Sequence, residues 1–303
     1  MQIIDAHHHV WDLAANYHPW LSDRPVQFRY GDYTAIRRDY LPAYYLEDTA
    51  GFDVIGSVYV EAEWDPRDPL GEVEWVAEQR EVYRLPSVMV AQAWLDREDA
   101  EDVLAAHGAT PFVRGIRHKP RGRDLGEAID AALPGSMGDP AWRRGYTMLA
   151  ANGLSFDLQT PWWNLAEARR LADDFPDTLI VLNHTGLPAD RSAEGLGGWR
   201  EAMSLFAGAE NTALKISGIG LPGRAWSVAD NRRVVLDAID IFGPGRCMFA
   251  SNFPVDSLVG SFATIFNGFL EITADFDASE RTAMFAGNAR RLYRIADADL
   301  RQG

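Results

Sequence analysis

Three consecutive histidines close the first apolar run of the chain, in the segment Asp5-Ala6-His7-His8-His9. Side chains alternate between the two faces of a strand, so His7 and His9 point to one side and His8 points to the other. Two imidazoles at this spacing can bind one divalent ion, and zinc takes imidazole nitrogen at about 2.0–2.1 Å. The segment therefore predicts a metal-binding or catalytic pair, against the alternative of a chance cluster.

A further histidine, His184, stands where a later apolar run ends and a loop begins. By itself it fits equally well as a histidine buried in the core with its hydrogen bonds satisfied. Together with His7 and His9 it makes a set of three imidazoles from two strands. We therefore expect His184 to act as a metal ligand and in catalysis.

Polar side chains that end other apolar runs are candidate substrate contacts. Arg117 and His118 follow one run, and an arginine fork can bind a carboxylate through two hydrogen bonds, although Arg117 could instead support the fold through an ion pair. Gln159 ends another run. Trp162, shortly after it, either stacks on a sugar or unsaturated ring or packs between a loop and a helix. These residues favour a small anionic or sugar-like substrate.

The elements that must position these groups alternate along the chain. Continuous apolar runs are typical of parallel strands covered by helices, and eight strands close a barrel that side chains can fill. Amphipathic segments fit between most of the runs, with Asn164 and Ser227 as candidate N-caps. This pattern predicts an α/β fold, a (β/α)8 TIM barrel. The expected strands are 2–8, 53–61, 87–94, 113–117, 154–159, 178–183, 213–217 and 247–251, and the expected helices are 70–83, 97–107, 140–152, 165–175, 228–242, 262–269 and 279–293.

One long segment interrupts the rhythm of the barrel. Residues 12–51 follow the first strand and are rich in aromatic side chains. A segment this long is usually functional or carries its own helix, and here it would lie over the barrel mouth as a cap. We expect Trp20 in this cap to form a wall of the substrate pocket. No linker divides the chain, so we expect residues 1–303 to form a single domain.

Composition excludes several classes of protein. The formal net charge of −15 disfavours nucleic-acid binding, because an acidic surface repels phosphates. The single cysteine, Cys247, can form no internal disulfide, and no signal peptide or membrane span is apparent. We therefore expect a cytoplasmic protein that does not bind membranes. A homo-oligomer remains an open possibility, since barrels associate through ordinary helical faces.

Taken together, these motifs resemble the amidohydrolase superfamily, in particular the group that includes sugar-acid lactonases and pyrone-dicarboxylate lactonase. The resemblance rests on Asp-x-His-x-His at residues 5–9, on His-x-Gly beginning at His184, and on Ser251-Asn252-Phe253-Pro254 after the last strand. It extends over nearly the whole chain and includes residues 38–42, 114–118 and 287–293. It implies a TIM barrel and one divalent metal, zinc by preference, held by His7, His9 and His184.

The chain departs from the family at the position that usually carries the catalytic aspartate. Asn252 stands there, and an amide cannot accept a proton from water at neutral pH. Asp256 in the following loop or Glu61 at the end of the second strand could replace the missing base, and we favour Glu61. The departure also makes a weak or dispensable metal more credible.

The resemblance implies a hydrolase that opens a carboxylic ester ring, the lactone of a sugar acid or a dicarboxylate, with activated water. A metal-dependent decarboxylase of a small carboxylic acid is one alternative, since similar histidines serve both reactions. A catalytically impaired barrel used for binding is the other, because Asn252 replaces the acid.

Overall fold

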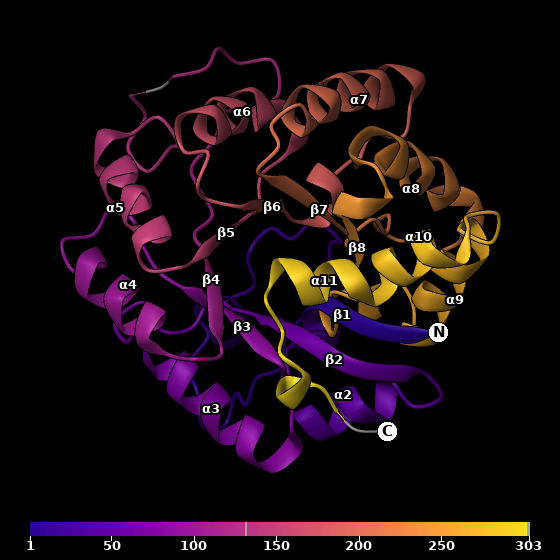
Figure 1. The fold of residues 1–303 in the computed structure, drawn as a ribbon, viewed down its shortest axis with the longest axis horizontal. Helices are drawn as coiled ribbons and strands as arrows, with labels where there is room; N and C mark the ends of the chain where they lie inside the picture. The colour runs from indigo at the N-terminus through magenta and orange to yellow at the C-terminus, as the bar shows by residue number, and fades with distance from the viewer. Residues whose placement is uncertain (131, 302–303) are drawn as a thin grey trace.

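An eight-stranded parallel sheet organises the chain, and the computed structural model describes residues 1–130 and 132–301. The strands follow one another around the sheet in sequence order, and helices surround them (Figure 1). The (β/α)8 barrel prediction is thereby confirmed. The strands are β1 (Gln2–His8), β2 (Asp53–Val60), β3 (Val88–Gln92), β4 (Val113–Arg117), β5 (Ser155–Leu158), β6 (Ile180–Leu182), β7 (Thr212–Ile216) and β8 (Cys247–Phe249).

The helices fall between the strands and after the last one. The barrel helices are α3 (Gly71–Tyr83), α4 (Ala100–Ala109), α5 (Pro140–Ala151), α6 (Leu165–Asp174), α7 (Ala193–Ala207), α8 (Val228–Phe242), α9 (Phe262–Ile272), α10 (Ala278–Thr282) and α11 (Asn288–Leu292). A π-helical turn, Ala283–Gly287, separates α10 from α11, where the sequence predicts one continuous helix. Within the described part of the chain, no helix is both long and apolar enough to cross a membrane.

Both faces of the strands are buried. Along β2, Val58 and Val60 belong to one apolar cluster, while Tyr59 between them belongs to the larger cluster that includes the helices. Strands buried on both faces carry apolar side chains at consecutive positions, which is why they appear in the sequence as continuous runs.

Hydrogen bonds between the end of β1 and the chain after β8 complete the barrel. The backbone amide of Asn252 donates to the His7 carbonyl at 2.8 Å, and the backbone amide of His9 donates to the Phe253 carbonyl at 2.7 Å. The buried carboxylate of Asp5 accepts from the backbone amide of Ser251 at 2.8 Å and from its hydroxyl at 2.6 Å. These contacts hold the chain after β8 against the histidine segment.

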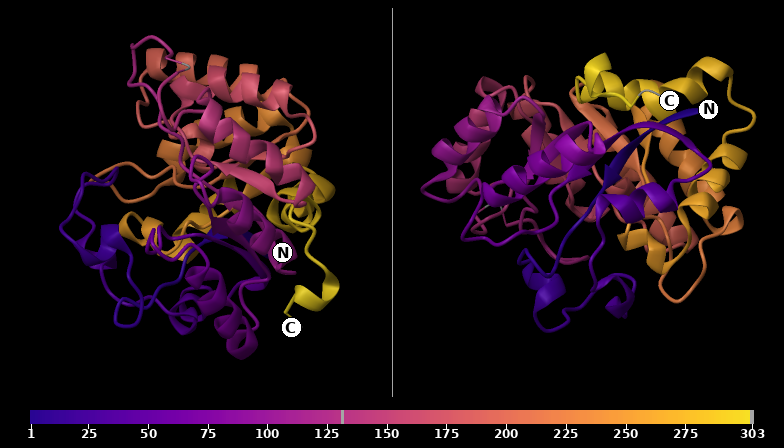
Figure 2. Two further views of the ribbon diagram at one scale, coloured as in Figure 1. Left: turned by 90° about the vertical axis from the view of Figure 1, so that its left-hand side faces the viewer. Right: turned by 90° about the horizontal axis from the view of Figure 1, so that it is seen from below.

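The cap follows β1 and contains α1 (Pro19–Ser22), a 3-10 turn (Thr34–Ile36) and α2 (Pro42–Asp48). An antiparallel bridge between Trp11 and Tyr40 ties its two ends together. Both views in Figure 2 place the indigo cap at the opposite end of the barrel from the two termini. The cap therefore lies at the end of the barrel where β1 ends and where its histidines lie.

Two local features differ from the sequence prediction. The sequence patterns did not predict α7, because Gly195, Gly197 and Gly198 fall in its first half and each costs a helix about 1 kcal/mol relative to alanine. Asn164 makes no side-chain cap hydrogen bond, so its N-cap prediction is wrong; its amide donates to the Thr160 hydroxyl instead. Ser227 does cap α8, as predicted.

Candidate active site

His7 and His9 present their ring nitrogens to each other at the end of β1. Their Nε2 atoms lie 3.2 Å apart, whereas His8 points away and its Nε2 lies 2.9 Å from the Ser57 hydroxyl. The Val60 carbonyl, 2.7 Å from His9 Nδ1, can only accept, so Nδ1 carries the proton and His9 Nε2 has a free lone pair. Burial lowers the pKa of both His7 and His9, and nearby cations lower it further, so both rings are neutral.

His184 approaches this pair from the loop after β6. Its ring centre lies 4.6 Å from that of His7, and its Nδ1 lies 3.0 Å from the Ser217 hydroxyl at the end of β7. Burial is the largest cause that lowers the pKa of His184, and the positive charge of Arg29 adds to it. The structure thus brings three neutral imidazoles together from strands far apart in the sequence.

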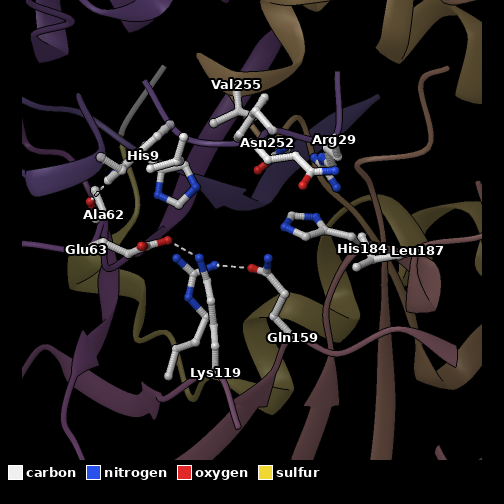
Figure 3. Close-up of a pocket in the computed structure, with 15 residues that line it drawn as sticks. His9, Arg29, Ala62, Glu63, Lys119, Gln159, His184, Leu187, Asn252 and Val255 are labelled. Atoms are coloured by element: carbon white, nitrogen blue, oxygen red, sulfur yellow. Dashed lines mark hydrogen bonds and ion pairs between the residues drawn. The ribbon is translucent and has the colours of Figure 1, made fainter. Parts of the chain in front are cut away.

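A cavity of about 340 Å³, here called the central cavity, opens above these histidines (Figure 3). The side chains that the argument below uses are those of His9, Glu63, Lys119, Gln159, His184 and Asn252. Glu63 pairs with Lys119 across one wall. Partial burial raises the pKa of Glu63, but the Lys119 charge and hydrogen bond outweigh this and leave the pKa below its usual value. The carboxylate is therefore ionised at neutral pH.

The guanidinium of Arg117 donates hydrogen bonds to other groups of the protein. Its Nε donates to Glu61 Oε1 at 2.5 Å, its Nη2 to the Glu61 carbonyl at 2.5 Å, and its Nη1 to Gln159 Oε1 at 3.0 Å. The ion pair is almost completely buried, because both side chains are 4% exposed. Since Gln159 Oε1 accepts from Arg117, the Gln159 amide nitrogen is the atom left to donate into the cavity, as Figure 3 shows.

Asn252 and Asp256 form a second buried polar cluster. Asn252 Nδ2 donates to Asp256 Oδ1 at 2.6 Å, and the same oxygen accepts from the Tyr30 hydroxyl at 3.0 Å and Arg29 Nη2 at 3.2 Å. Burial raises the pKa of Asp256, and these donors only partly offset it. Asp256 therefore joins the loop after β8 to the cap, and Asn252 donates to the carboxylate that makes this connection.

Four of the residues that line the central cavity have left-handed backbone conformations, including Leu187 with a φ angle of +57°. The φ angles of the other three are +55° for Glu63, +54° for His184 and +55° for Asn252. A residue with a side chain seldom adopts such a conformation unless its surroundings impose it, and such residues gather at functional sites. This backbone strain supports the assignment of the cavity as the functional site.

The candidate site residues fall into three locations. His9, His184, Asn252, Arg117, Gln159 and Trp20 line the central cavity, and His7 lies buried beside His9. Glu61 and His118 line a neighbouring cavity instead, and Asp256 lies behind Asn252.

Trp162 lies against α7. A Cβ at Gly198 would come within 2.8 Å of the Trp162 ring, so the ring fits over the helix only because residue 198 is glycine. Among the described residues, Trp162 is not part of the lining of the central cavity, where we expected it to contact substrate.

Sequence reasoning missed three charged groups of the central cavity: Glu63, Lys119 and Arg29. Glu63 stands only two residues beyond Glu61, but the strand ends at Val60, so alternation could not predict its direction. Arg29 comes from the cap, whose path no periodic pattern in the sequence reveals.

The residues present fit a zinc ion only in part. Two ligands of a tetrahedral zinc lie about 3.3 Å apart, close to the 3.2 Å between His7 Nε2 and His9 Nε2. However, the described residues contain no group of three or more His, Cys, Asp or Glu side chains arranged to hold a metal ion. Asn252 offers only a neutral amide oxygen, a weaker metal ligand than the carboxylate of an aspartate.

Comparison with known proteins identifies a family and several relatives that match over nearly the whole chain. The amidohydrolase family profile matches residues 4–295. A Sinorhizobium fredii protein described as uncharacterized, y4mH, is 41% identical, with 97% of this chain and 98% of that protein covered. An L-fucono-1,5-lactonase of Burkholderia multivorans is 27% identical, with 97% and 96% covered. The crystal structure of an amidohydrolase from Burkholderia multivorans with bound zinc superposes with a TM-score of 0.79 at 25% identity, covering 98% of this chain and 100% of the other.

Proposed function

Because the chain belongs to the amidohydrolase family, we propose that it hydrolyses the 1,5-lactone of a sugar acid. The observation that carries the proposal is the set of three neutral imidazoles beside one cavity of about 340 Å³. This volume lies at the small end of ligand pockets and suits one hydroxylated ring. The full-length similarity to an L-fucono-1,5-lactonase supports the same substrate class.

The polar groups of the cavity match the oxygens of such a ring. The Gln159 amide nitrogen and the Lys119 ammonium donate hydrogen bonds, and the Glu63 carboxylate accepts them. Trp20 contributes an apolar wall, and its indole nitrogen donates to the Ala62 carbonyl at 2.9 Å, which fixes the ring. A sugar-like or anionic substrate is therefore favoured over an apolar one.

His184 is the group that stabilises charge on the reacting ester. When the Ser217 hydroxyl donates to Nδ1, the ring proton of His184 stands on Nε2. That N–H can donate to the carbonyl oxygen as water attacks the acyl carbon, and then to the ring oxygen as the C–O bond breaks. The product is an open-chain hydroxy acid.

Glu63 is our choice for the acceptor of the water proton. The Glu61 carboxylate is held by Arg117 and lines the neighbouring cavity, and Asp256 is enclosed by its three donors. Glu63 is ionised and belongs to the central cavity, so its carboxylate can reach a water molecule there. Glu61 and Asp256 then position Arg117 and Asn252 rather than react.

A divalent ion held by His7 and His9 would polarise the ester carbonyl and lower the pKa of a bound water. His7 Nε2 and His9 Nε2, which lie 3.2 Å apart, are the nitrogens that would bind it.

A panel of hexono-1,5-lactones tests the proposal. Each turnover releases one proton, which a pH indicator detects, and the rate of spontaneous hydrolysis is subtracted. We expect saturable hydrolysis by the wild type and a loss of kcat of roughly 100-fold or more in His184→Asn. Circular dichroism verifies that this variant remains folded. No hydrolysis of any lactone, or release of carbon dioxide from small carboxylic acids, would contradict the proposal.

A further inference from the structure

A second cavity of about 320 Å³, here called the side cavity, adjoins the central cavity at the ends of β2, β3 and β4. The two share Glu63, Arg117 and Lys119 in their linings. The side cavity is further lined by Pro19, Trp64, Pro66, Gln92, Trp94 and His118. Nothing in the proposed lactone chemistry uses these six residues, so the side cavity has no assigned role.

The charged groups of the side cavity neutralise one another. Glu61 pairs with Arg117, and Glu63 pairs with Lys119. These pairs leave no excess of either sign at the surface that a ligand would meet. An ionic ligand would have to break one of the pairs, whereas a neutral ligand would not.

Aromatic side chains form the walls of the side cavity. The guanidinium carbon of Arg97 lies 5.2 Å from the centre of the Trp94 ring, a cation–π contact that supports the indole. Trp64 packs edge-on against His18, with ring centres 5.2 Å apart. Because Trp64 is only 8% exposed, the partly exposed Trp94 indole is the flat apolar surface on which the C–H face of a sugar ring can pack.

Neutral hydrogen-bonding groups complete the lining. The Leu95 amide donates to His118 Nδ1 at 3.1 Å, so the neutral ring carries its proton on Nε2, which remains a donor. The Gln92 amide nitrogen donates to the Trp64 carbonyl at 3.3 Å, while among the described residues Gln92 Oε1 has no partner. The side cavity thus offers one neutral donor, His118 Nε2, beside the Trp94 indole, with Gln92 Oε1 buried behind its lining.

We propose that the side cavity is a second sugar subsite, so that the substrate is a lactone carrying a further glycosyl residue. This inference rests on the lactonase function proposed above. The lactone ring occupies the central cavity, and the neutral second sugar packs on Trp94 with a hydroxyl on His118.

The link between the two sugars must pass the Glu63–Lys119 pair, which belongs to both cavities. The side chains of this pair are 47% and 38% exposed. An ion pair this exposed contributes little net stability, so the two side chains can separate at small cost. The pair therefore divides the cavities without closing the passage between them.

Kinetics on matched substrates test the second subsite. Cellobiono-1,5-lactone and lactobiono-1,5-lactone share the gluconolactone ring of D-glucono-1,5-lactone and differ from it by one neutral sugar. We expect kcat/KM for the glycosylated lactones to exceed that for the parent by about tenfold. Trp94→Ala should reduce this ratio to about one. The matched control is Trp163→Ala, which alters a tryptophan that lines neither cavity and should keep the wild-type ratio.

A binding measurement separates failure of the subsite from failure of the lactonase function. Titration calorimetry with cellobionate, compared with gluconate, should show tighter binding of cellobionate to the wild type but not to Trp94→Ala. If this difference appears without any lactone hydrolysis, the subsite stands and the proposed function falls. If all three lactones are hydrolysed equally well and Trp94→Ala changes no ratio, the second subsite is wrong and the lactonase function stands.

Discussion

Introducing an aspartate at residue 252 should destabilise the fold rather than supply the missing catalytic base. Asn252 Nδ2 lies 2.6 Å from Asp256 Oδ1, and both residues are 1% exposed. Asn252→Asp replaces a donor by a second carboxylate at hydrogen-bond distance. A hydrogen bond to a charged group contributes about 1.5–3 kcal/mol, and two adjacent carboxylates cannot both be ionised without further cost. We therefore expect the variant to lose about 3 kcal/mol of unfolding free energy at pH 8.

The loss in Asn252→Asp should depend on pH in a definite direction. The paired carboxyls share a proton in the folded state, so their pKa rises above its unfolded value. The destabilisation is then absent below the unfolded pKa and grows as the pH rises through the folded one. Urea unfolding at pH 5 and pH 8, followed by tryptophan fluorescence, measures this, with Asn252→Ala as the control that adds no charge. Wild-type stability of Asn252→Asp at pH 8, or a deficit that shrinks as pH rises, would refute the reasoning.

Four further predictions follow from the same geometry. Glu63→Gln should lower kcat by roughly 100-fold with little change in stability, as measured by lactone hydrolysis and urea unfolding; retention of wild-type kcat would exclude Glu63 as the proton acceptor. Arg117→Met should cost about 3–5 kcal/mol in urea unfolding because it leaves the buried Glu61 carboxylate unpaired, and a loss below 1 kcal/mol would contradict the buried ion pair. Burial raises the pKa of Asp5 from 3.8 to about 6, so the folded protein binds an extra proton between these pH values. The unfolding free energy of the wild type should therefore fall by about 3 kcal/mol, relative to that of Asp5→Asn, as pH rises from about 4 to 6. Parallel pH profiles of the two proteins in urea unfolding would count against this prediction. Dialysis against a chelator should remove zinc without unfolding the chain, as elemental analysis and circular dichroism would report, whereas retention of one zinc per chain would indicate a complete ligand set.

The barrel was predictable from the sequence because its strands are buried on both faces. The expected strands 2–8 and 113–117 agree with β1 and β4 at both ends, and the other predicted strands overlap those observed. Prediction failed where tertiary contacts override local preference. The glycines of α7 are tolerated because Gly198 makes room for the Trp162 ring, a contact that no local pattern encodes.

The convergence of the histidines was also predictable, because strand alternation and parallel topology place His7, His9 and His184 at one end of the barrel. The roles of the carboxylates were not. Glu61 is held by Arg117, a partner 56 residues away, and only the folded chain reveals that its carboxylate is occupied. Glu63 lines the central cavity, and its backbone there has a left-handed conformation that the sequence does not predict.

A double-mutant cycle on His9 and His184 tests the central claim most directly, since the account requires both imidazoles to act on one lactone in one cavity. Residues that act as a unit give non-additive losses. We therefore predict that kcat/KM for lactone hydrolysis in the His9→Asn, His184→Asn double variant is no lower than in the more impaired single variant. Losses that multiply, or single variants that retain wild-type rates, would contradict a shared active site.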